Sequence, residues 1–232
     1  MIDLSCVRTT SDKRDIEEMV GAARLYGFGQ VSVLQCFIPY TRELLQEAPG
    51  VRLVGNVSFP SGSDSTSIKV AQAGEMRAAG CDEIDVVMNI GRLRSGELVE
   101  VEADVRAVIE TVHPIPVKVI IEVMCLTPEE TRQACEICMR SGAAYVKTGT
   151  GWAERGTTLQ DVHLIKSLVG DSLQIKASGG IRDLDGLLKM YGAGARRFGV
   201  NLKSGIKIAE EALGQNLPSP PEQRKVQQVS HG

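Results

Sequence analysis

Short apolar segments rich in β-branched residues alternate with longer amphipathic segments along almost the whole chain. The apolar segments are five to eight residues long and carry hydrophobic side chains on both faces. That pattern is typical of parallel strands covered by helices. The eight predicted strands are Ile2–Val7, Gln30–Phe37, Arg52–Phe59, Glu83–Asn89, Val117–Met124, Ala144–Thr148, Leu173–Ala177 and Arg196–Val200.

The amphipathic segments between these runs predict helices, and several carry recognisable boundary signals. Thr127 followed by Pro128 is a favourable helix start, because proline at the first helical position loses no hydrogen bond. Gly27 and Gly142 stand where a helix should end before the next strand. The predicted helices are Thr10–Leu25, Ser65–Ala79, Glu100–Thr111, Pro128–Ser141, Thr158–Val169 and Asp183–Tyr191.

The repeat of strand and helix predicts a single barrel. The 232 residues divide into eight units of about 29 residues, enough for a strand, a loop and a helix. An open doubly wound sheet usually has fewer strands, and no G-x-G-x-x-G motif follows the first one. We therefore predict an α/β protein with one (β/α)8 (TIM) barrel over residues 1–214. Residues 215–232 are proline-rich and polar, which predicts a flexible tail.

Composition and charge narrow the protein class further. The chain is 43% hydrophobic and 24% charged, with a net charge of -3, and it has no basic block that would favour nucleic acid. No apolar run reaches the roughly 18 residues of a membrane span. The first residues do not resemble a secretory signal, and the six cysteines are irregularly spaced. We expect a soluble cytoplasmic protein with reduced thiols, no nucleic-acid partner and no membrane partner.

Three ionisable residues lie inside predicted strands, where the active site of a barrel is built. Asp85 is on the fourth strand, Lys147 on the sixth and Lys176 on the seventh. The lysines are 29 residues apart, one full unit, so they should lie at similar heights on adjacent strands. Because alternate strands contribute to the same interior layer, Asp85 should converge with them.

Two neighbouring lysines in a barrel interior suggest covalent chemistry. Repulsion between ammonium groups and the cost of burial both lower the pKa of a lysine. A free amine near neutral pH can form a Schiff base with a carbonyl compound. The alternative is that each lysine reaches solvent or forms a structural ion pair. The convergence with Asp85 favours catalysis by Lys147, Lys176 and Asp85.

Three further charged residues receive structural interpretations. Lys118 and Glu122 are four residues apart on the fifth strand, so both can point inward. Lys118 should lie low in the barrel and form an ion pair, whereas Glu122 reaches the upper end and can support the site or be purely structural. Lys69 falls on a predicted helix, and we expect it on the surface.

Glycine-rich turns follow the sixth, seventh and eighth strands and predict an anion site. Exposed backbone N–H groups at such turns can bind phosphate, particularly beside Arg182 or Lys203. Each turn by itself serves equally well as a tight loop. The candidate substrate- or phosphate-binding residues are Thr150, Gly151, Ser178, Gly179, Gly180, Gly199, Lys203 and Ser204.

The histidines and cysteines do not indicate a second catalytic or metal site. The three histidines, His113, His163 and His231, do not fall at the predicted strand ends, so a metal-assisted aldolase or a Ser/His hydrolase lacks its residues. We therefore predict no metal and no cofactor. Cys135 and Cys138 form a C-x-x-C pair in the middle of a helix, which favours core packing.

Four segments resemble the deoxyribose-phosphate aldolase family, which are class I aldolases with a (β/α)8 barrel. The resemblance runs from about Ile2 to Ala212. It is carried by Glu83–Gly91, Lys118–Glu122, Val146–Trp152 and Lys176–Arg182, in the same order as in that family.

The resemblance implies a role for each ionisable residue. Lys147 would be the Schiff-base nucleophile, Lys176 its activating neighbour and Asp85 the acid and base of a proton relay. It also implies reversible cleavage of 2-deoxy-D-ribose 5-phosphate to acetaldehyde and D-glyceraldehyde 3-phosphate, without a metal. The partners would be small aldehydes and sugar phosphates, and related barrels often form homo-oligomers through their outer helices.

One departure from the family leaves alternatives open. A Ser-Ser pair usually follows the strand-eight glycine, whereas here Gly199 is followed by Val200 and Asn201. The substrate could then carry no phosphate or have a different acceptor group, unless Lys203 binds the phosphate directly. A different lysine-dependent barrel lyase and a non-catalytic sugar-phosphate binder are the other hypotheses.

Overall fold

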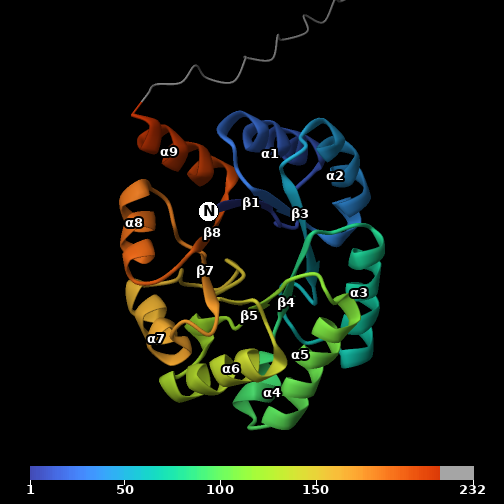
Figure 1. Cartoon of the computed structure of the whole chain (residues 1–232), viewed down its shortest axis with the longest axis vertical. Coiled ribbons are helices and arrows are strands. Elements are labelled where there is room, and N and C mark those ends of the chain that lie inside the picture. Colours follow the sequence, from blue (N-terminus) through green and yellow to red (C-terminus); the bar gives the residue numbers. More distant parts are fainter. Residues whose placement is uncertain (215–232) are drawn as a thin grey trace, which may run out of the picture.

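Eight parallel strands form a closed barrel with its helices outside, as predicted (Figure 1). The computed structural model describes residues 1–214, so the predicted flexible tail at residues 215–232 lies outside the described residues. Each strand pairs with the next, and β8 closes the ring by pairing with β1. The strands are β1 (Ile2–Cys6), β2 (Gln30–Val33), β3 (Arg52–Val57), β4 (Glu83–Val87), β5 (Val117–Ile120), β6 (Tyr145–Lys147), β7 (Gln174–Ser178) and β8 (Arg197–Asn201).

The helices cover the outer face of the barrel, and hydrogen-bonded caps mark several of their starts. At the start of α6, the Thr127 hydroxyl accepts from Glu130 N while the Glu130 side chain accepts from Thr127 N, so two unpaired helix donors are satisfied. The α-helices are α1 (Lys13–Tyr26), α2 (Ile38–Leu44), α3 (Thr66–Ala78), α4 (Ile90–Arg94), α5 (Leu98–Val112), α6 (Pro128–Ser141), α7 (Leu159–Val169), α8 (Leu184–Gly192) and α9 (Leu202–Leu213). Short 3-10 turns occur at Gln35–Phe37, Leu45–Glu47 and Val123–Cys125.

Two predicted strands, Gln30–Phe37 and Val117–Met124, extend four residues past the observed ones. After β2 the chain turns into a 3-10 segment and α2, and after β5 Glu122 adopts a left-handed conformation (φ 47°) that ends the strand. Val123 stays buried in the following turn. A buried apolar run therefore continues past the end of the strand, and its hydrophobicity alone does not show where the strand stops.

Alternate positions on each strand divide the interior into two regions. On β4, Ile84 and Val86 face outward into the apolar layer that joins strands to helices. Glu83 and Asp85 face inward and contact lysines from other strands. The layer between strands and helices is hydrophobic, whereas the barrel interior carries several charges. This alternation follows from the period of two along a strand.

Lys69 contradicts the sequence-based prediction of a surface position. It lies on α3 but is completely buried against α5, with its Nζ 2.6 Å from Asp104 Oδ2 and 3.1 Å from Val87 O. Asp104 is itself buried and accepts a hydrogen bond from Thr66. The buried carboxylate on the neighbouring helix supplies the partner that a buried lysine needs, and nothing in the local sequence of α3 announces it.

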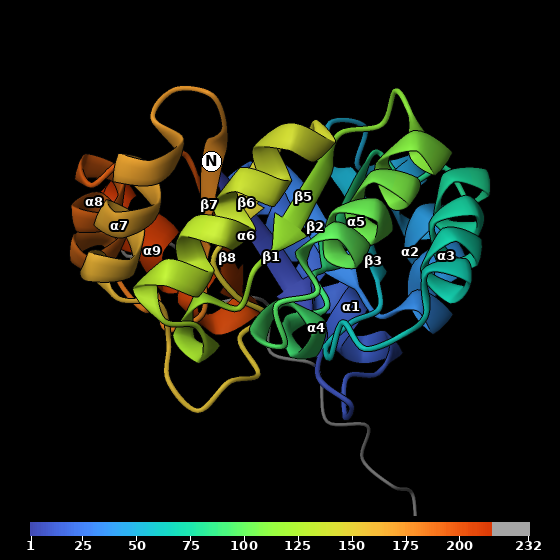
Figure 2. The same ribbon diagram turned by 90° about the horizontal axis from the view of Figure 1, so that it is seen from below.

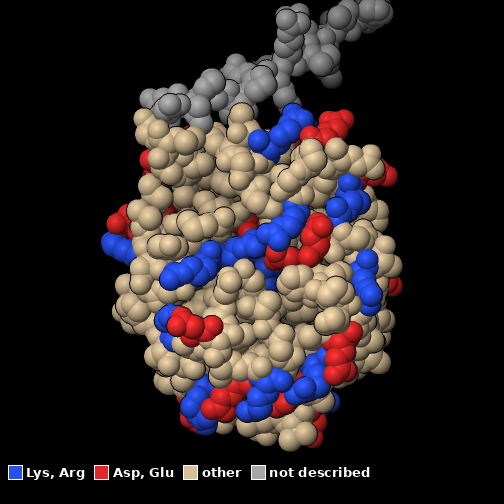
Figure 3. All heavy atoms as spheres, viewed as in Figure 1, with Lys and Arg blue, Asp and Glu red and all other residues tan. Residues whose placement is uncertain are grey.

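The carboxyl ends of the strands form one end of the barrel. Figure 2 shows this end at its lower edge, with the loops that follow β1 and β6 projecting beyond the strands. In Figure 3, a band of basic side chains crosses the middle of the face shown, with acidic side chains beside it. Among residues 1–214, no helix is both long and apolar enough to cross a membrane.

Candidate active site

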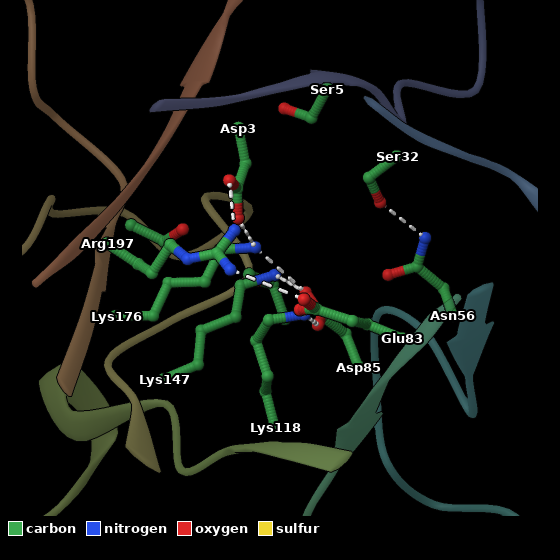
Figure 4. Close-up of polar contacts among 12 residues, drawn as sticks. Asp3, Ser5, Ser32, Asn56, Glu83, Asp85, Lys118, Lys147, Lys176 and Arg197 are labelled. Carbon is green, nitrogen blue, oxygen red and sulfur yellow. Dashed lines mark hydrogen bonds and ion pairs between the residues drawn. The ribbon is translucent and has the colours of Figure 1, made fainter. Parts of the chain in front are cut away.

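Asp85, Lys147 and Lys176 converge inside the barrel, as the strand spacing predicted. The register pairs Lys147 directly with Lys176 on neighbouring strands. Asp85 Oδ2 lies 2.7 Å from Lys147 Nζ and 3.3 Å from Lys176 Nζ. All three side chains are almost completely buried. Figure 4 shows them reaching toward one another from β4, β6 and β7.

A larger set of charges surrounds this triad. Lys118 Nζ lies 2.9 Å from Asp85 Oδ1 and 2.5 Å from Glu83 Oε2, so the predicted ion pair of Lys118 is present and includes Asp85. Asp3 Oδ2 lies 2.8 Å from Lys176 Nζ, and Arg197 bridges Asp3 and Glu83 at 3.0 and 3.3 Å. The buried charges are therefore mutually compensated, which lowers the cost of removing them from water.

Lys147 is the lysine that loses its proton most readily. Burial lowers its pKa first, Asp85 opposes this, and the positive charge of Lys176 lowers it again, with a net value of about 8. The cost of burial is a larger cause than the repulsion between the two lysines. The fraction of Lys147 that is free amine is therefore much larger at neutral to mildly alkaline pH than for an ordinary lysine.

Lys176 and Asp85 hold their charges. Burial would lower the pKa of Lys176, but Asp3 and Asp85 together raise it above its ordinary value. Burial would raise the pKa of Asp85, but the three lysines lower it well below its usual range. The pKa values of the two lysines therefore shift in opposite directions, because Lys176 has two carboxylate neighbours and Lys147 has one.

A cavity of about 500 Å³ opens above the charged cluster at the carboxyl ends of the strands. Lys147 and Lys176 line it, whereas Asp85 lies beneath them and does not. The cavity extends from β2 and β3 across to the loops after β6, β7 and β8. A small molecule in this cavity can therefore reach the Lys147 amine.

Seven of the eight predicted substrate- or phosphate-binding residues line this cavity. They are Thr150, Gly151, Ser178, Gly179, Gly180, Gly199 and Lys203. Ser204 does not line it, and its backbone N–H is already taken by the Asn201 side chain, which caps α9 at 2.9 Å. Among the residues the structure describes, the predicted binding residues therefore meet at one cavity, with the exception of Ser204.

Glycine is required at two places in the rim. Gly179 and Gly180 have φ of 93° and 85°, a region that residues with a side chain rarely adopt. At Gly199, a methyl group would overlap the Ser178 hydroxyl. The glycines thus let the loops after β7 and β8 lie close together and leave backbone groups facing the cavity.

Glu122 supports the loop after β6 from outside the cavity. Its carboxylate accepts from Thr150 Oγ1 at 2.6 Å and from Thr150 N at 3.0 Å. Thr150 Oγ1 also accepts from Trp152 N at 3.0 Å. Thr150 is therefore held in place by Glu122, the supporting role that the sequence left open for this glutamate.

Several cavity residues were not singled out from the sequence. Arg8 and Arg155 line the cavity together with the expected Arg182, and Arg8 lies 5.3 Å from the ring of Trp152. Asp3 and Arg197 complete the charged cluster. Asp85 was predicted because it is a charged residue inside an apolar strand. Asp3 and Arg197 also lie in strands, so the same criterion would have identified them. Arg8 and Arg155 lie in loops, where no such signal exists.

Four of the six cysteines are buried. Cys135 and Cys138 are completely buried in α6, as expected for core packing, and Cys36 is exposed and outside the cavity lining. All six cysteines are free thiols. Within residues 1–214, no group of three or more His, Cys, Asp or Glu side chains is arranged to hold a metal ion.

A closed barrel with a buried lysine–aspartate–lysine cluster beneath a cavity at its carboxyl end defines a (β/α)8-barrel enzyme. Residues 12–202 match the DeoC/LacD family of aldolases. The chain is also 42% identical over 212 residues to the deoxyribose-phosphate aldolase of Rhizobium meliloti (strain 1021), covering 91% of this chain and 85% of the relative. The protein belongs to the DeoC/LacD aldolase family.

Solved structures agree with this assignment. QR15, an aldolase, is 36% identical and superposes with a TM-score of 0.86, covering 91% of this chain and 94% of its own. The deoxyribose phosphate aldolase of Aeropyrum pernix, described as a unique tetrameric structure, is 27% identical with a TM-score of 0.83, covering 91% of this chain and 89% of its own. The family and the barrel are therefore supported both by sequence and by structure.

Proposed function

We propose that this protein is a class I aldolase that reversibly cleaves 2-deoxy-D-ribose 5-phosphate to acetaldehyde and D-glyceraldehyde 3-phosphate. The observation that carries the proposal is the Lys147 amine, which is buried, has a pKa of about 8 and faces the cavity. Relatives named deoxyribose-phosphate aldolase support the choice of substrate.

The reaction begins with attack of the neutral Lys147 amine on the aldehyde carbon of the open-chain sugar. Loss of water from the carbinolamine gives a protonated imine, which can accept an electron pair. Removal of the proton from the C3 hydroxyl then breaks the C2–C3 bond, and its electrons enter the imine to form an enamine. The second product, D-glyceraldehyde 3-phosphate, leaves as an aldehyde. Protonation of the enamine and hydrolysis release acetaldehyde and restore Lys147.

Asp85 and Lys176 supply the charges that these steps require. Asp85 lies 2.7 Å from Lys147 Nζ, so it can exchange protons with the reacting nitrogen directly or through a water molecule. Lys176 remains positive and, after burial, is a further cause of the lowered pKa of Lys147. Catalysis near neutral pH follows from one lysine whose pKa is lowered to about 8 beside one that stays protonated.

The phosphate binds at the loops after β7 and β8. Gly179 and Gly180 face the cavity beside Arg182 and Lys203, which together offer backbone donors and two positive charges. The Asn201 cap on Ser204 N favours one alternative, because it removes a backbone donor from the start of α9. The alternative is a related aldolase that accepts a non-phosphorylated or otherwise altered aldehyde.

Retro-aldol assays with 2-deoxyribose 5-phosphate and with 2-deoxyribose separate these two substrates. We expect acetaldehyde release from both sugars, with a kcat/KM at least about tenfold higher for the phosphorylated one, because of the charge-assisted contacts to phosphate. Equal values would favour the altered acceptor. If neither sugar reacts while acetaldehyde still forms a reducible adduct, a different lysine-dependent lyase is favoured.

Two further properties follow from the same assignment. We propose a cytoplasmic location, supported by the six free cysteines, since thiols persist in a reducing compartment. We also propose a homo-oligomer, supported by the tetrameric relative from Aeropyrum pernix. Small aldehydes and sugar phosphates are the partners of the site.

A further inference from the structure

Asn56 lies on the wall of the cavity at β3, next to the strand that carries Asp85. The register pairs Asn56 with Asp85, and Asn56 lines the same cavity as Lys147. Its side chain is 1% exposed. Nδ2 donates to Ser32 Oγ at 2.8 Å and to Val33 O at 2.9 Å, whereas Oδ1 has no hydrogen-bond partner.

The orientation of this amide is fixed. Val33 O can only accept a hydrogen bond, so a flipped amide would set two acceptor oxygens against each other. In Figure 4 the Asn56 nitrogen points toward Ser32 and its oxygen points toward the lysine–aspartate cluster. A buried acceptor without a partner costs free energy, and one that faces a binding cavity gains a partner when a suitable ligand enters.

The chemistry of the ligand can be deduced from what an acceptor oxygen needs. Oδ1 requires a donor, and an aldehyde carbonyl or an ionised phosphate offers only acceptors. Hydroxyl groups are therefore the parts of a sugar phosphate that can pair with Asn56. In the aldehyde that adds to the enzyme-bound enamine, the C1 oxygen is a carbonyl, which leaves the hydroxyl on the adjacent carbon.

We propose that Asn56, oriented by Ser32, binds the 2-hydroxyl of the acceptor aldehyde and thereby selects 2-hydroxyaldehydes. This inference rests on the proposed aldolase function and adds a specificity-determining residue on the β2–β3 side of the cavity, away from the phosphate loops. A cavity built to accept from a hydroxyl discriminates against an aldehyde that lacks it, because the buried oxygen then stays unpaired.

The test is aldol addition of acetaldehyde to two acceptors that differ in one hydroxyl, 2-hydroxypropanal and propanal. For the wild type we expect a kcat/KM about ten- to a hundredfold higher with 2-hydroxypropanal. Asn56→Val should lose most of that preference, because its kcat/KM falls much more with 2-hydroxypropanal than with propanal. Ser32→Ala, which removes one of the two bonds that orient the amide, should lose part of the preference.

Gln30→Leu provides a matched control. Gln30 is a fully buried amide on the neighbouring strand, also without partners for Oε1 and Nε2, but it does not line the cavity. We expect its acceptor preference to equal that of the wild type. If Asn56→Val does not fold, Asn56→Ala takes its place. We expect the same loss of preference for 2-hydroxypropanal from that variant.

The outcomes separate the role of Asn56 from the proposed aldolase function. A wild type that is active but shows no preference, or an Asn56 variant that loses activity equally with both acceptors, overturns the role of Asn56 alone. A wild type that cleaves 2-deoxyribose 5-phosphate but adds acetaldehyde to neither acceptor overturns the inference about Asn56 alone. A wild type that does neither overturns the proposed aldolase function and this inference with it.

Discussion

The reactivity of Lys147 depends on which neighbouring charges each of the two lysines has. Lys176 contacts Asp3 at 2.8 Å and Asp85 at 3.3 Å, while Lys147 contacts Asp85 alone at 2.7 Å. Burial lowers the pKa of Lys147 to about 8, and the second carboxylate keeps Lys176 protonated. The unequal supply of carboxylates, more than the closeness of the lysines, separates their roles.

The pH dependence of imine formation should follow the titration of Lys147. Because its pKa is lowered to about 8, the fraction of free amine rises as the pH increases through that value. We expect the rate of acetaldehyde trapping by cyanoborohydride to rise between about pH 6 and 9 and to level off above. A rate that continues to rise to pH 10 would mean an ordinary lysine.

Substitutions of the two neighbours should shift this midpoint in opposite directions. Lys176→Met removes a positive charge that lowers the pKa of Lys147, so the midpoint should rise. Asp85→Asn removes the carboxylate that raises the pKa, so the midpoint should fall even though proton transfer becomes slower. The trapping rate measured against pH for each variant gives both midpoints.

Lys189→Met is the control for these two variants. Lys189 is an exposed lysine on α8 that pairs with Asp185, away from the cavity. Its midpoint should match that of the wild type. Shifts in the same direction for Lys176→Met and Asp85→Asn would refute the electrostatic account.

Sequence reasoning found the residues of the triad but not their full surroundings. A charge inside an apolar strand is visible in the sequence, and strand spacing shows that Asp85, Lys147 and Lys176 can meet. The pKa of each of these residues depends on the groups that the closed barrel places opposite it. Asp3 meets Lys176 only because β8 pairs with β1, a contact between residues 173 positions apart.

At the scale of the element, periodicity identified the long helices and missed others. Six of the longer helices have an apolar stripe that the sequence displays, and four of them, α1, α6, α7 and α8, also begin at a side chain that caps the helix. By contrast, α2 (Ile38–Leu44) and α4 (Ile90–Arg94) are too short for a clear period, and α9 (Leu202–Leu213) follows its strand without an intervening loop. These segments are apolar because they are buried against the barrel. Buried helices and buried strands are both apolar, so this property does not distinguish them.

The Lys69–Asp104 pair joins α3 to α5, and its disruption should destabilise the fold. Lys69→Met leaves the Asp104 carboxylate buried with Thr66 as its remaining partner. We expect a loss of about 3–5 kcal/mol in the free energy of unfolding, measured with urea. The double variant Lys69→Met/Asp104→Leu should recover much of that loss, because it leaves no unpaired charge. Equal stability of Lys69→Met and wild type would show that the pair is dispensable.

At the scale of the whole molecule, the barrel interior acts as a single electrostatic unit. Charges from β1, β4, β5, β6, β7 and β8 are linked through ion pairs across the axis. The eightfold repeat of strand and helix predicted the barrel that closes this unit. The wall formed by Ser32 and Asn56 was not predicted, because a serine and an asparagine in a strand carry no signal of their own.

This interior predicts how stability depends on acid. Burial raises the pKa of Asp3, but Lys176, Lys118 and Arg197 lower it below its ordinary value, and the pKa of Asp85 is also lowered. A carboxyl with a lowered pKa in the folded state adds stability above its unfolded pKa of about 3.9, and this stability is lost as the pH falls further.

Urea unfolding between pH 6 and 2 measures this contribution. The free energy of unfolding of the wild type should fall steeply below about pH 4, and Asp3→Asn should show a shallower fall because one of the two carboxyls is gone. Asp185→Asn, at an exposed residue on α8, should follow the wild-type curve. Identical slopes for wild type and Asp3→Asn would show that Asp3 does not contribute to the loss of stability in acid.

The most direct test of the central claim is to reduce the protein with cyanoborohydride in the presence of acetaldehyde and to locate the adduct by peptide mass spectrometry. We expect one ethyl group on Lys147 in the wild type and none on that peptide in Lys147→Leu. An unmodified Lys147 in the active wild-type protein, or an adduct at Lys176 or Lys118 instead, would contradict it.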